Sequence, residues 1–527
     1  MKKTLSILLA TVFAFSLAAC GTRGEQSATQ APSASASSSA AGPEGIDTSQ
    51  HVVINYMTTG DIPNNDTDAV MAELNKVLTE KVNAELNIRW IEWTDYMTNY
   101  NLTLASQDGS VDLVGTASDW LDAWPNSQNG AFLPLSEELL KTYAPQTYAQ
   151  VPAENWELCK FNGQIYLIPE DNYAQWINHG FMYRGDYARE AGIANGVHNW
   201  ADLEKYFQYI KDSYPDVVPW DAKADASIVT QMSTGWNHSK TPNITIDGLR
   251  QEVFFGESKD NPYTVSRYFL EGAELVNFAQ TMKKWNDAGF WREDVLNNTV
   301  DTREAMYAGQ SGADQHHVST WYSTVRPEMD KKQPGSDVGF FLFGEENSNV
   351  ISINITHGAM AIASKSKNPE RALMVYDLLR NDPEIYRLFQ YGREGVDYTV
   401  DGNMLLRPDG FDNALQGISS NFWWGRNDSL ELRQSNFAWD EYDKVTPIYA
   451  EMAVPYPYGQ VIFDLEPIST ELDTISNIYS TYMPIIVFGK SADPAAYVQE
   501  FRDALKNAGY EKAINEVESQ LASVYGS

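Results

Sequence analysis

The chain has 527 residues, and its 71 acidic side chains outnumber its 38 lysines and arginines, which gives a formal net charge of −33 at pH 7. An acidic surface repels nucleic acid and anionic lipid, so neither is expected as a direct partner. The sequence has only two cysteines. A chain of this length buries a large core, so we predict that packing rather than a disulfide framework stabilises it.

The first twenty residues have the pattern of an export signal. Lys2 and Lys3 precede an apolar stretch, residues 5–17, that is too short to span a bilayer as a lasting anchor. The stretch leads into Leu-Ala-Ala-Cys-Gly at 17–21, which resembles the bacterial lipobox, whose cysteine becomes the lipid-modified first residue of the mature protein. We therefore predict a lipoprotein signal peptide at 1–20 with acylation, for example by palmitate, at Cys20. An ordinary signal peptide with an incidental cysteine is the alternative.

Residues 21–50 consist mainly of Ala, Ser, Thr, Gln, Gly and Pro, with almost nothing large to bury. This composition predicts a disordered tether, and a flexible chain of that length reaches roughly 30 Å. Such a tether would hold a globular body off a membrane. The predicted location is therefore the cell membrane, with the protein anchored by lipid on the extracytoplasmic face.

Strand and helix patterns alternate from residue 51 onward. The predicted strands are 51–57, 86–93 and 111–115. Helical patterns begin near Thr67 and Thr94, so the alternation predicts βαβ units and a mostly parallel sheet. In such sheets, ligands bind beyond the carboxyl ends of the strands. The acidic and amide side chains at 61–68 are interpreted as a turn and helix cap rather than a metal site. The glycine and the final glutamate of a calcium loop are missing there.

The middle of the chain carries weaker patterns. Residues 169–172 are predicted as a hinge and 176–184 as a strand. Residues 215–265 are rich in Gly, Pro, Asn and aromatic residues without a clear period, which predicts loops. Clear helical patterns begin at Trp200 and cover 272–288.

Residues 351–398 contain the strongest start and stop signals. Residues 351–356 alternate apolar and polar as a half-buried strand does, and a run of small residues at 358–363 continues as extended chain. Two helices are predicted to follow, because a capping residue stands before proline at 368–369 and again at 382–383. Gly392 is predicted to end the second helix and to leave 393–398 as an exposed polar turn.

Three motifs in this stretch resemble those of a known family. They are Asn-Pro-Glu-Arg-Ala at 368–372, Leu-Leu-Arg-Asn-Asp-Pro-Glu at 378–384 and Tyr-Gly-Arg-Glu-Gly-Val-Asp-Tyr at 391–398. Their order is similar to that in carbohydrate-type (family 1) extracellular solute-binding proteins of bacterial ABC importers. The stretch 463–521 resembles the C-terminal extension found in a lipoprotein sub-branch of these proteins.

The resemblance implies an α/β fold of the type II periplasmic-binding-protein-like class, with two lobes, a hinge and an interlobe cleft. It places the N-terminal lobe at 51–170 and 358–400. The C-terminal lobe, including the extension, is expected at 171–357 and 401–527. The implied function is that of a monomeric receptor that captures an oligosaccharide in the cleft and delivers it to the membrane permease subunits of an ABC transporter, without a cofactor or metal.

Aromatic residues in predicted loops are the candidates for a sugar site. A flat ring covers the apolar C–H face of a sugar, while Asp, Asn, Arg and His bond its rim of hydroxyls. Trp423 and Trp424 are adjacent and cannot both face a core in one regular element, so one of them is expected at the surface. The predicted ligand-binding residues are Asp61, Asp119, Trp120, Trp176, His317, Trp321, Arg393, Trp423, Trp424 and Arg426.

Catalytic motifs are nearly absent from the sequence, and we predict that the protein is not an enzyme. His316 and His317 are not predicted to share a metal, because adjacent residues of a strand face opposite sides. A surface-anchored glycoside hydrolase is the main alternative, since 71 acidic residues leave room for a catalytic carboxylate pair. A lipoprotein that binds a peptide or another small molecule, and a surface scaffold without a small ligand, are the others.

Overall fold

The computed structural model describes residues 46–60, 63–94, 96–170, 179–249, 252–412, 415–418, 420 and 422–526. Of the residues named above, Lys2, Lys3, Cys20, Asp61 and Trp176 lie outside these ranges, as do the predicted signal peptide, most of the tether and residues 171–172 of the predicted hinge. Within the described ranges, no helix has the length and apolar character needed to cross a membrane.

The first lobe is built on a five-stranded sheet in the order β2-β1-β3-β14-β6. Its strands are β1 Val52–Thr59, β2 Ala84–Ile91, β3 Leu113–Thr116, β6 Ile168–Pro169 and β14 Ala359–Ile362. β1 is parallel to β2 and to β3, as the alternation predicts, whereas β14 is antiparallel to β3 and β6. The chain therefore returns to this sheet after a long excursion, at the run of small residues that was predicted to be extended.

Helices cover this sheet, and their polar and apolar spacing explains how they pack. They are α1 Thr67–Val82, α2 Tyr96–Ser106, α3 Ala123–Gln128, α4 Glu137–Tyr143, α5 Pro145–Gln150, α6 Ala153–Glu157, α14 Pro369–Asn381 and α15 Pro383–Tyr391. α1 buries Val70, Leu74 and Leu78 along one stripe. α14 and α15 start at the predicted prolines, and the Asp382 carboxylate accepts hydrogen bonds from two N–H groups of the first turn of α15.

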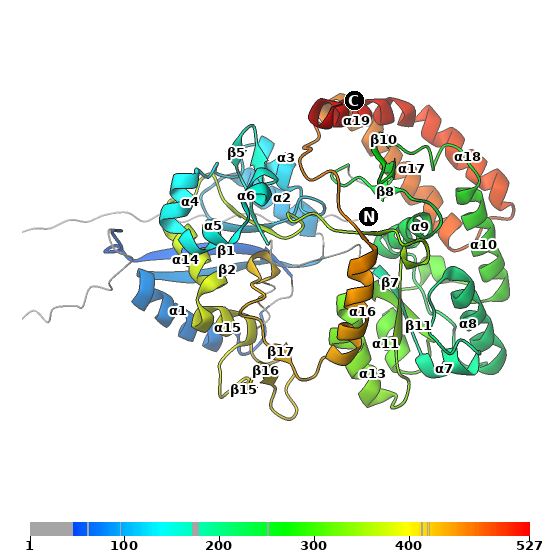
Figure 1. The fold of residues 1–527 in the computed structure, drawn as a ribbon, viewed down its shortest axis with the longest axis horizontal. Helices are drawn as coiled ribbons and strands as arrows, with labels where there is room; N and C mark the ends of the chain where they lie inside the picture. The colour runs from blue at the N-terminus through cyan, green and yellow to red at the C-terminus, as the bar shows by residue number, and fades with distance from the viewer. Residues whose placement is uncertain are drawn as a thin grey trace, which may run out of the picture. The chain divides into compact units, whose positions relative to one another are not determined.

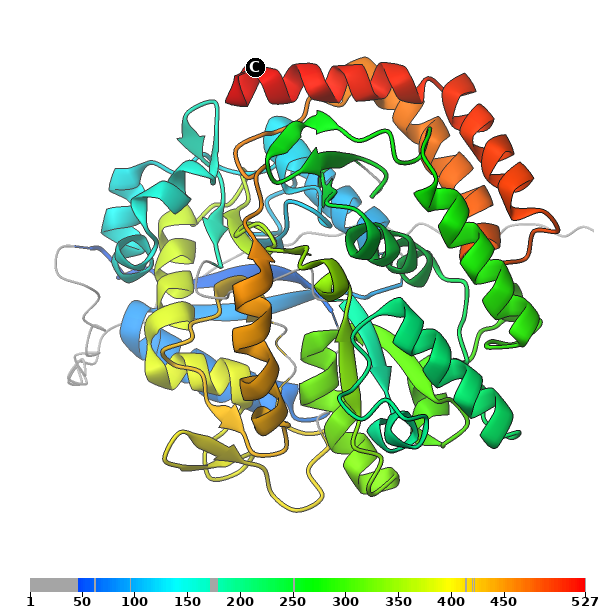
Figure 2. The ribbon, with the colours of Figure 1, turned by 45° about the vertical axis from the view of Figure 1, so that its right-hand side comes forward.

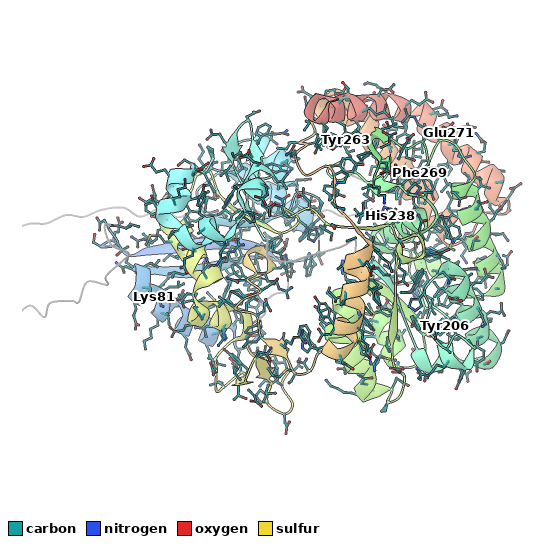
Figure 3. All side chains as sticks on the ribbon, viewed as in Figure 1. Lys81, Tyr206, His238, Tyr263, Phe269 and Glu271 are labelled. Atoms are coloured by element: carbon teal, nitrogen blue, oxygen red, sulfur yellow. The ribbon has the colours of Figure 1, made fainter. Side chains whose placement is uncertain are left out.

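α1, α14 and α15 lie together beside β1 and β2 (Figure 1). Lys81, labelled in Figure 3, joins the end of α1 to the junction between α14 and α15, since its Nζ lies 2.7 Å from Asp382 Oδ2. The helices that follow the recrossing strand are thus part of the first lobe.

The second lobe is organised around β7 His179–Tyr183, which pairs antiparallel with β11 Ala313–His317 and β12 Gly339–Leu342. A smaller sheet contains β8 Ile244–Thr245, β9 Phe255–Ser258 and β10 Asn261–Val265. The helices of this part are α7 Gly185–Glu190, α8 Trp200–Ser213, α9 Ala226–Lys240, α10 Glu274–Ala288, α11 Thr302–Tyr307, α12 Val318–Thr320, α13 Arg326–Lys332 and α16 Trp439–Met452. α8 begins at Trp200, as predicted, and α10 lies within the predicted range 272–288.

The prediction of loops at 215–265 is wrong, because this stretch contains α9 and the three strands of the smaller sheet. α9 buries every residue from Met232 to Ser239. A helix that is buried all round has no amphipathic period, so its sequence carries little of the pattern that identifies helices.

Three C-terminal helices complete the second lobe: α17 Ser469–Val487, α18 Pro494–Asn507 and α19 Tyr510–Tyr525. α17 and α18 lie beside α10, as Figures 1 and 2 show. Their buried side chains belong to the same hydrophobic core as those of α8, α9 and α10. Tyr263 of β10, labelled in Figure 3, stacks on Tyr525 of α19 with ring centroids 4.3 Å apart. The extension is therefore integral to the second-lobe core.

The structure differs from the predictions at two places around the central helices. Of the predicted strand at 351–356, only Ile351 lies in a strand, β13 Val350–Ile351, which pairs with β18 Ala453–Val454. The turn at 393–398 is exposed only in part: Glu394, Gly395 and Val396 are exposed, whereas Asp397 and Tyr398 are each only 2% exposed. Ion pairing with Arg393 buries the Asp397 carboxylate, which a polar composition did not indicate.

The core assignments also differ from the predicted lobe boundary at residue 400. A small sheet lies here, with β15 Thr399–Asp401, β16 Met404–Leu406 and β17 Arg433–Gln434. Ile418, Phe422 and Trp424 pack in the first-lobe core. The chain therefore stays with the first lobe until shortly before α16, whose Tyr449 packs in the second lobe.

Candidate ligand-binding site

Three stacked tryptophans stand at the carboxyl edge of the first-lobe sheet. Trp93 follows β2, Trp120 follows β3, and Trp423 lies in the turn 422–425. The Trp93 ring is stacked on Trp120 at 6.0 Å and on Trp423 at 6.4 Å. β2 and β3 are both parallel to β1, so their carboxyl ends meet at one edge, and this brings Trp93 and Trp120 together. We call Trp93, Trp120 and Trp423 the aromatic wall.

The wall is open to solvent at Trp93, which is 45% exposed, while Trp120 and Trp423 are half-buried. Tyr96, at the start of α2, packs edge-on against Trp93. Aromatic rings with accessible faces and fixed neighbours lose little conformational freedom when a ligand stacks on them. This arrangement suits a flat apolar ligand surface.

Trp424 was predicted to bind ligand, but the structure places it in the core. It is fully buried, and its Nε1 donates a hydrogen bond of 2.9 Å to Thr58 Oγ1 of β1. Gly115 of β3 makes room for the ring, because a Cβ there would lie 2.6 Å from the indole nitrogen. Trp424 stacks behind Trp120 at 5.6 Å and supports the wall from the protein side.

A half-buried ion pair lies beside the wall. His357 Nδ1 is 2.6 Å from Asp119 Oδ2, and the His357 carbonyl accepts a hydrogen bond from Trp120 Nε1 at 3.2 Å. Burial alone would lower the pKa of His357, but the carboxylates of Asp119, Glu170 and Asp247 outweigh it and raise the pKa to about 9. His357 is therefore charged at neutral pH.

Asp119 keeps unused hydrogen-bonding capacity in this arrangement. Its Oδ1 is buried and has no hydrogen-bond partner within the part of the chain that the structure describes. A carboxylate oxygen accepts hydrogen bonds from hydroxyl groups, so Asp119 has the chemistry of a rim group for a polyhydroxylated ligand. The structure thus brings the predicted residues Asp119, Trp120 and Trp423 together.

His317 lies in a cluster of three histidines at the end of the second-lobe sheet. Its ring centroid is 4.0 Å from that of His179, and its Nδ1 is 3.0 Å from His316 Nδ1. The expectation that His316 and His317 face opposite sides is wrong, because β11 ends at His317 and the alternation stops there. Burial lowers the pKa of His179 to about 3 and that of His316 to about 4, so both are neutral at pH 7.

Neutral imidazoles donate and accept hydrogen bonds, so this cluster has the chemistry to contact hydroxyl groups. No group of three or more His, Cys, Asp or Glu side chains among the described residues is arranged to hold a metal ion.

Trp321 does not have the predicted role. It is 1% exposed in the second-lobe core, stacks on Phe340, and donates from Nε1 to the Val338 carbonyl at 2.8 Å. Its ring is packed inside the protein, and its one polar atom has a hydrogen-bond acceptor there. The polar residues next to Trp321 indicated an exposed loop, but the Trp321 side chain is buried in the second-lobe core.

The two predicted arginines are held in ion pairs of the first lobe. Arg393 Nε lies 2.9 Å from Asp397 Oδ2, and Arg393 Nη2 lies 3.0 Å from Asp66 Oδ2. Arg426 Nε lies 3.0 Å from Glu431 Oε1. These contacts give both side chains a structural role and do not place them on the aromatic wall. Asp61 and Trp176 lie outside the described residues.

Trp93 is the residue that sequence reasoning missed. The pattern at 86–93 was assigned to one strand, whereas β2 ends at Ile91 and Trp93 lies beyond it. The useful signal was position, because an aromatic residue just past the carboxyl end of a parallel strand stands where ligands bind.

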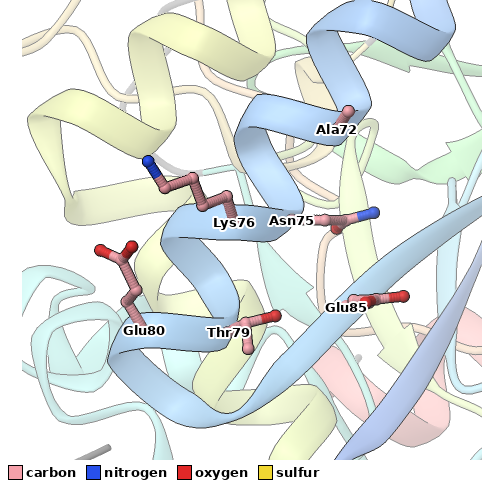
Figure 4. A pocket seen from close by; sticks show the side chains of 6 residues that line it. All are labelled: Ala72, Asn75, Lys76, Thr79, Glu80 and Glu85. Carbon is pink, nitrogen blue, oxygen red and sulfur yellow. The ribbon is translucent and has the colours of Figure 1, made fainter.

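A separate surface hollow of about 540 Å³ lies on the first lobe, against α1 and the start of β2 (Figure 4). It is lined by Ala72, Asn75, Lys76, Thr79, Glu80 and Glu85. The hollow is wide and has no aromatic side chain. It therefore lacks the combination of ring faces and buried polar groups found at the wall.

Comparison with known proteins agrees with the fold. The model of the family described as bacterial extracellular solute-binding protein matches residues 64–382, and a domain of unknown function, DUF3502, matches 457–524. A carbohydrate ABC transporter substrate-binding protein of Streptococcus pneumoniae is 25% identical over 495 residues, covering 90% of this chain and 91% of the relative.

Solved structures show the same two-lobed α/β fold. The N-glycan transport solute-binding protein NgtS from Streptococcus pneumoniae superposes with a TM-score of 0.69 at 22% identity, covering 90% of this chain and 99% of NgtS. The alginate-binding protein AlgQ2 superposes with a TM-score of 0.62 at 17% identity, covering 91% and 100%. Because the family model spans more than half of the sequence, the chain belongs to the bacterial extracellular solute-binding protein family.

Proposed function

We propose that this protein is the solute-binding receptor of an ABC importer, and that it captures an oligosaccharide between its lobes and delivers it to the membrane permease. The observation that carries the proposal is the aromatic wall beside the Asp119–His357 pair. The rings offer faces for the C–H surfaces of sugars, and the Asp119 carboxylate accepts from hydroxyls at the rim.

The known relatives support this proposal. The S. pneumoniae relative is described as a carbohydrate ABC transporter substrate-binding protein, and NgtS has been solved in complex with Man5GlcNAc. A receptor that closes by hinge motion needs few covalent connections between its lobes. The proposed reaction is binding and release, with no bond broken in the sugar.

A thermal-shift screen with neutral oligosaccharides, run beside a reducing-sugar assay, tests the proposal. A receptor gives a raised melting temperature without release of reducing ends, because ligand binds only the native state. Release of reducing ends would instead identify a glycoside hydrolase. A raised melting temperature with peptides or other small molecules, but not with sugars, would identify a receptor for a different ligand. No change in melting temperature with any ligand favours a scaffold.

The proposal includes a lipid anchor at Cys20. We expect Cys20→Ala to release the protein from membranes into the medium, because no other hydrophobic attachment is predicted in the tether. Fractionation and immunoblotting of cells check this, with Ser27→Ala as a control substitution in the same tether. If the Cys20→Ala protein stays with membranes after a high-salt wash, the anchor lies elsewhere.

A further inference from the structure

A strap formed by residues 456–463 runs between the two hydrophobic cores. Val461 and Phe463 pack in the second-lobe core, whereas Ile462 packs against the first-lobe core. Side chains of extended chain alternate in direction, so consecutive residues at 461–463 reach opposite lobes. Gly459 faces Leu158 of the first lobe, since a Cβ on Gly459 would lie 3.3 Å from a Leu158 methyl group.

The last helix of the chain holds the strap in place. Tyr525 Oη accepts a hydrogen bond from the Gln460 N–H at 3.1 Å. Gln520 accepts from the Asp464 N–H at 2.8 Å and donates to the Asp464 carbonyl at 2.9 Å. Both side chains belong to α19, and Gln520 lies in the segment matched by the domain of unknown function. α19 therefore fixes the position of a segment that touches both lobes.

The strap forms one side of a small cavity of about 30 Å³. Ser118 and Trp124 line it from the first lobe, and Asp247, Tyr456 and Phe463 line it from the second. This volume holds a water molecule or one small substituent but not a sugar ring. Ser118 is two residues from Trp120, so the same loop reaches both the cavity and the aromatic wall.

Asp247 is the acidic group of this cavity. Tyr456 Oη accepts a hydrogen bond from the Asp247 N–H at 3.1 Å and also bonds the Asp247 carboxyl group. None of the described residues that line the cavity is a lysine or an arginine. Burial and the negative charges of Asp119 and Glu252 raise the pKa of Asp247 well above its usual range, which marks a setting unfavourable to negative charge.

We infer that this cavity is a subsite for an uncharged polar substituent, such as a hydroxymethyl group, of a neutral oligosaccharide, and that Asp247, positioned by Tyr456, binds that substituent. The inference rests on the proposed function and adds the ligand class. A uronate carboxylate is close in size to a hydroxymethyl group, so the subsite can distinguish the two substituents only by their charge. Placing an anion in this partly enclosed site costs desolvation, and the repulsion from Asp119 and Glu252 outweighs the attraction of the charged His357.

Titration calorimetry on the mature protein tests the ligand class. The probes are neutral tetrasaccharides of glucose, mannose and galactose, and the same tetrasaccharides oxidised at C6 to uronates. For any neutral tetrasaccharide that binds, we expect an affinity at least about 100-fold higher than that of the corresponding uronate. Uronates that bind equally well or better would overturn the inference while leaving the receptor proposal intact. Failure of both sets to bind would contradict the receptor proposal itself.

Variants test the role of the cavity. Asp247→Asn keeps the shape and changes the hydrogen bonding, so we expect affinity for the neutral tetrasaccharide to fall roughly 10- to 100-fold. Tyr456→Phe removes the hydroxyl that positions Asp247 and should weaken binding in the same direction, with both variants folded by melting curve. Asp216→Asn, at an exposed residue of the second lobe, is the matched control and should bind normally. Unchanged affinity in both cavity variants would show that the ligand does not reach this subsite.

Discussion

Trp424→Ala is expected to lower the free energy of unfolding by about 3–5 kcal/mol, the range for removing a fully buried large aromatic side chain. The ring is enclosed by the first-lobe core, and its indole nitrogen is bonded to Thr58. The substitution would leave a cavity behind Trp120 and remove the hydrogen bond that the Thr58 hydroxyl accepts, and the surrounding sheet relaxes only in part.

Urea unfolding followed by circular dichroism measures this effect, with Trp423→Ala as the matched control in the neighbouring position. Trp423 is half-buried, so its removal should cost clearly less stability. Equal losses in the two variants would mean that Trp424 is not the buried member of the pair.

The second large effect is on ligand affinity. Trp93→Ala and Trp423→Ala are each expected to weaken oligosaccharide binding by about 2 kcal/mol or more, roughly 30-fold, which is the scale of an interface hot spot. Both rings belong to the aromatic wall, and Trp93 presents the most accessible face of the three. Their removal should change the melting temperature of the free protein little.

Titration calorimetry with the neutral oligosaccharide found by the thermal-shift screen measures these affinities. Trp90→Ala is the control, since Trp90 is a half-buried tryptophan of β2 whose ring is not part of the wall. If both wall variants bind like the wild type, the ligand does not stack on this surface and the site must be sought elsewhere between the lobes.

Local signals in the sequence were enough to predict much of the fold. The prolines at 369 and 383 start α14 and α15 because a proline at the first helical position loses no intrahelical hydrogen bond. The stripe of α1 and the alternation of strands with helices are likewise properties of neighbouring residues. α9 was missed because burial on all sides removes that local contrast.

The candidate site depended more on contacts between distant segments. Adjacency alone indicated that Trp423 and Trp424 would have different environments, but which ring is buried depends on Thr58 and Gly115, more than 300 positions away in sequence. Trp321 and Arg393 also looked like surface residues in their local sequence. Their partners, Val338 and Asp66, come from other elements and give both side chains structural roles.

The charged groups near the wall show the same limit. His357 was not singled out from the sequence, yet it pairs with Asp119 after the chain has recrossed between the lobes. The strap leads into a C-terminal extension known only by resemblance, and its contact with both cores depends on the packing of α19. Residue type predicts which groups can bind a sugar, whereas topology decides which of them meet.

Small-angle X-ray scattering with and without saturating neutral oligosaccharide tests the central claim most directly, namely that the protein captures its ligand by closing its two lobes. The account predicts that the radius of gyration falls when ligand binds, because hinge closure brings the lobes together. Occupancy should be established by calorimetry on the same sample. An unchanged scattering profile in a sample with fully bound ligand would contradict capture by lobe closure.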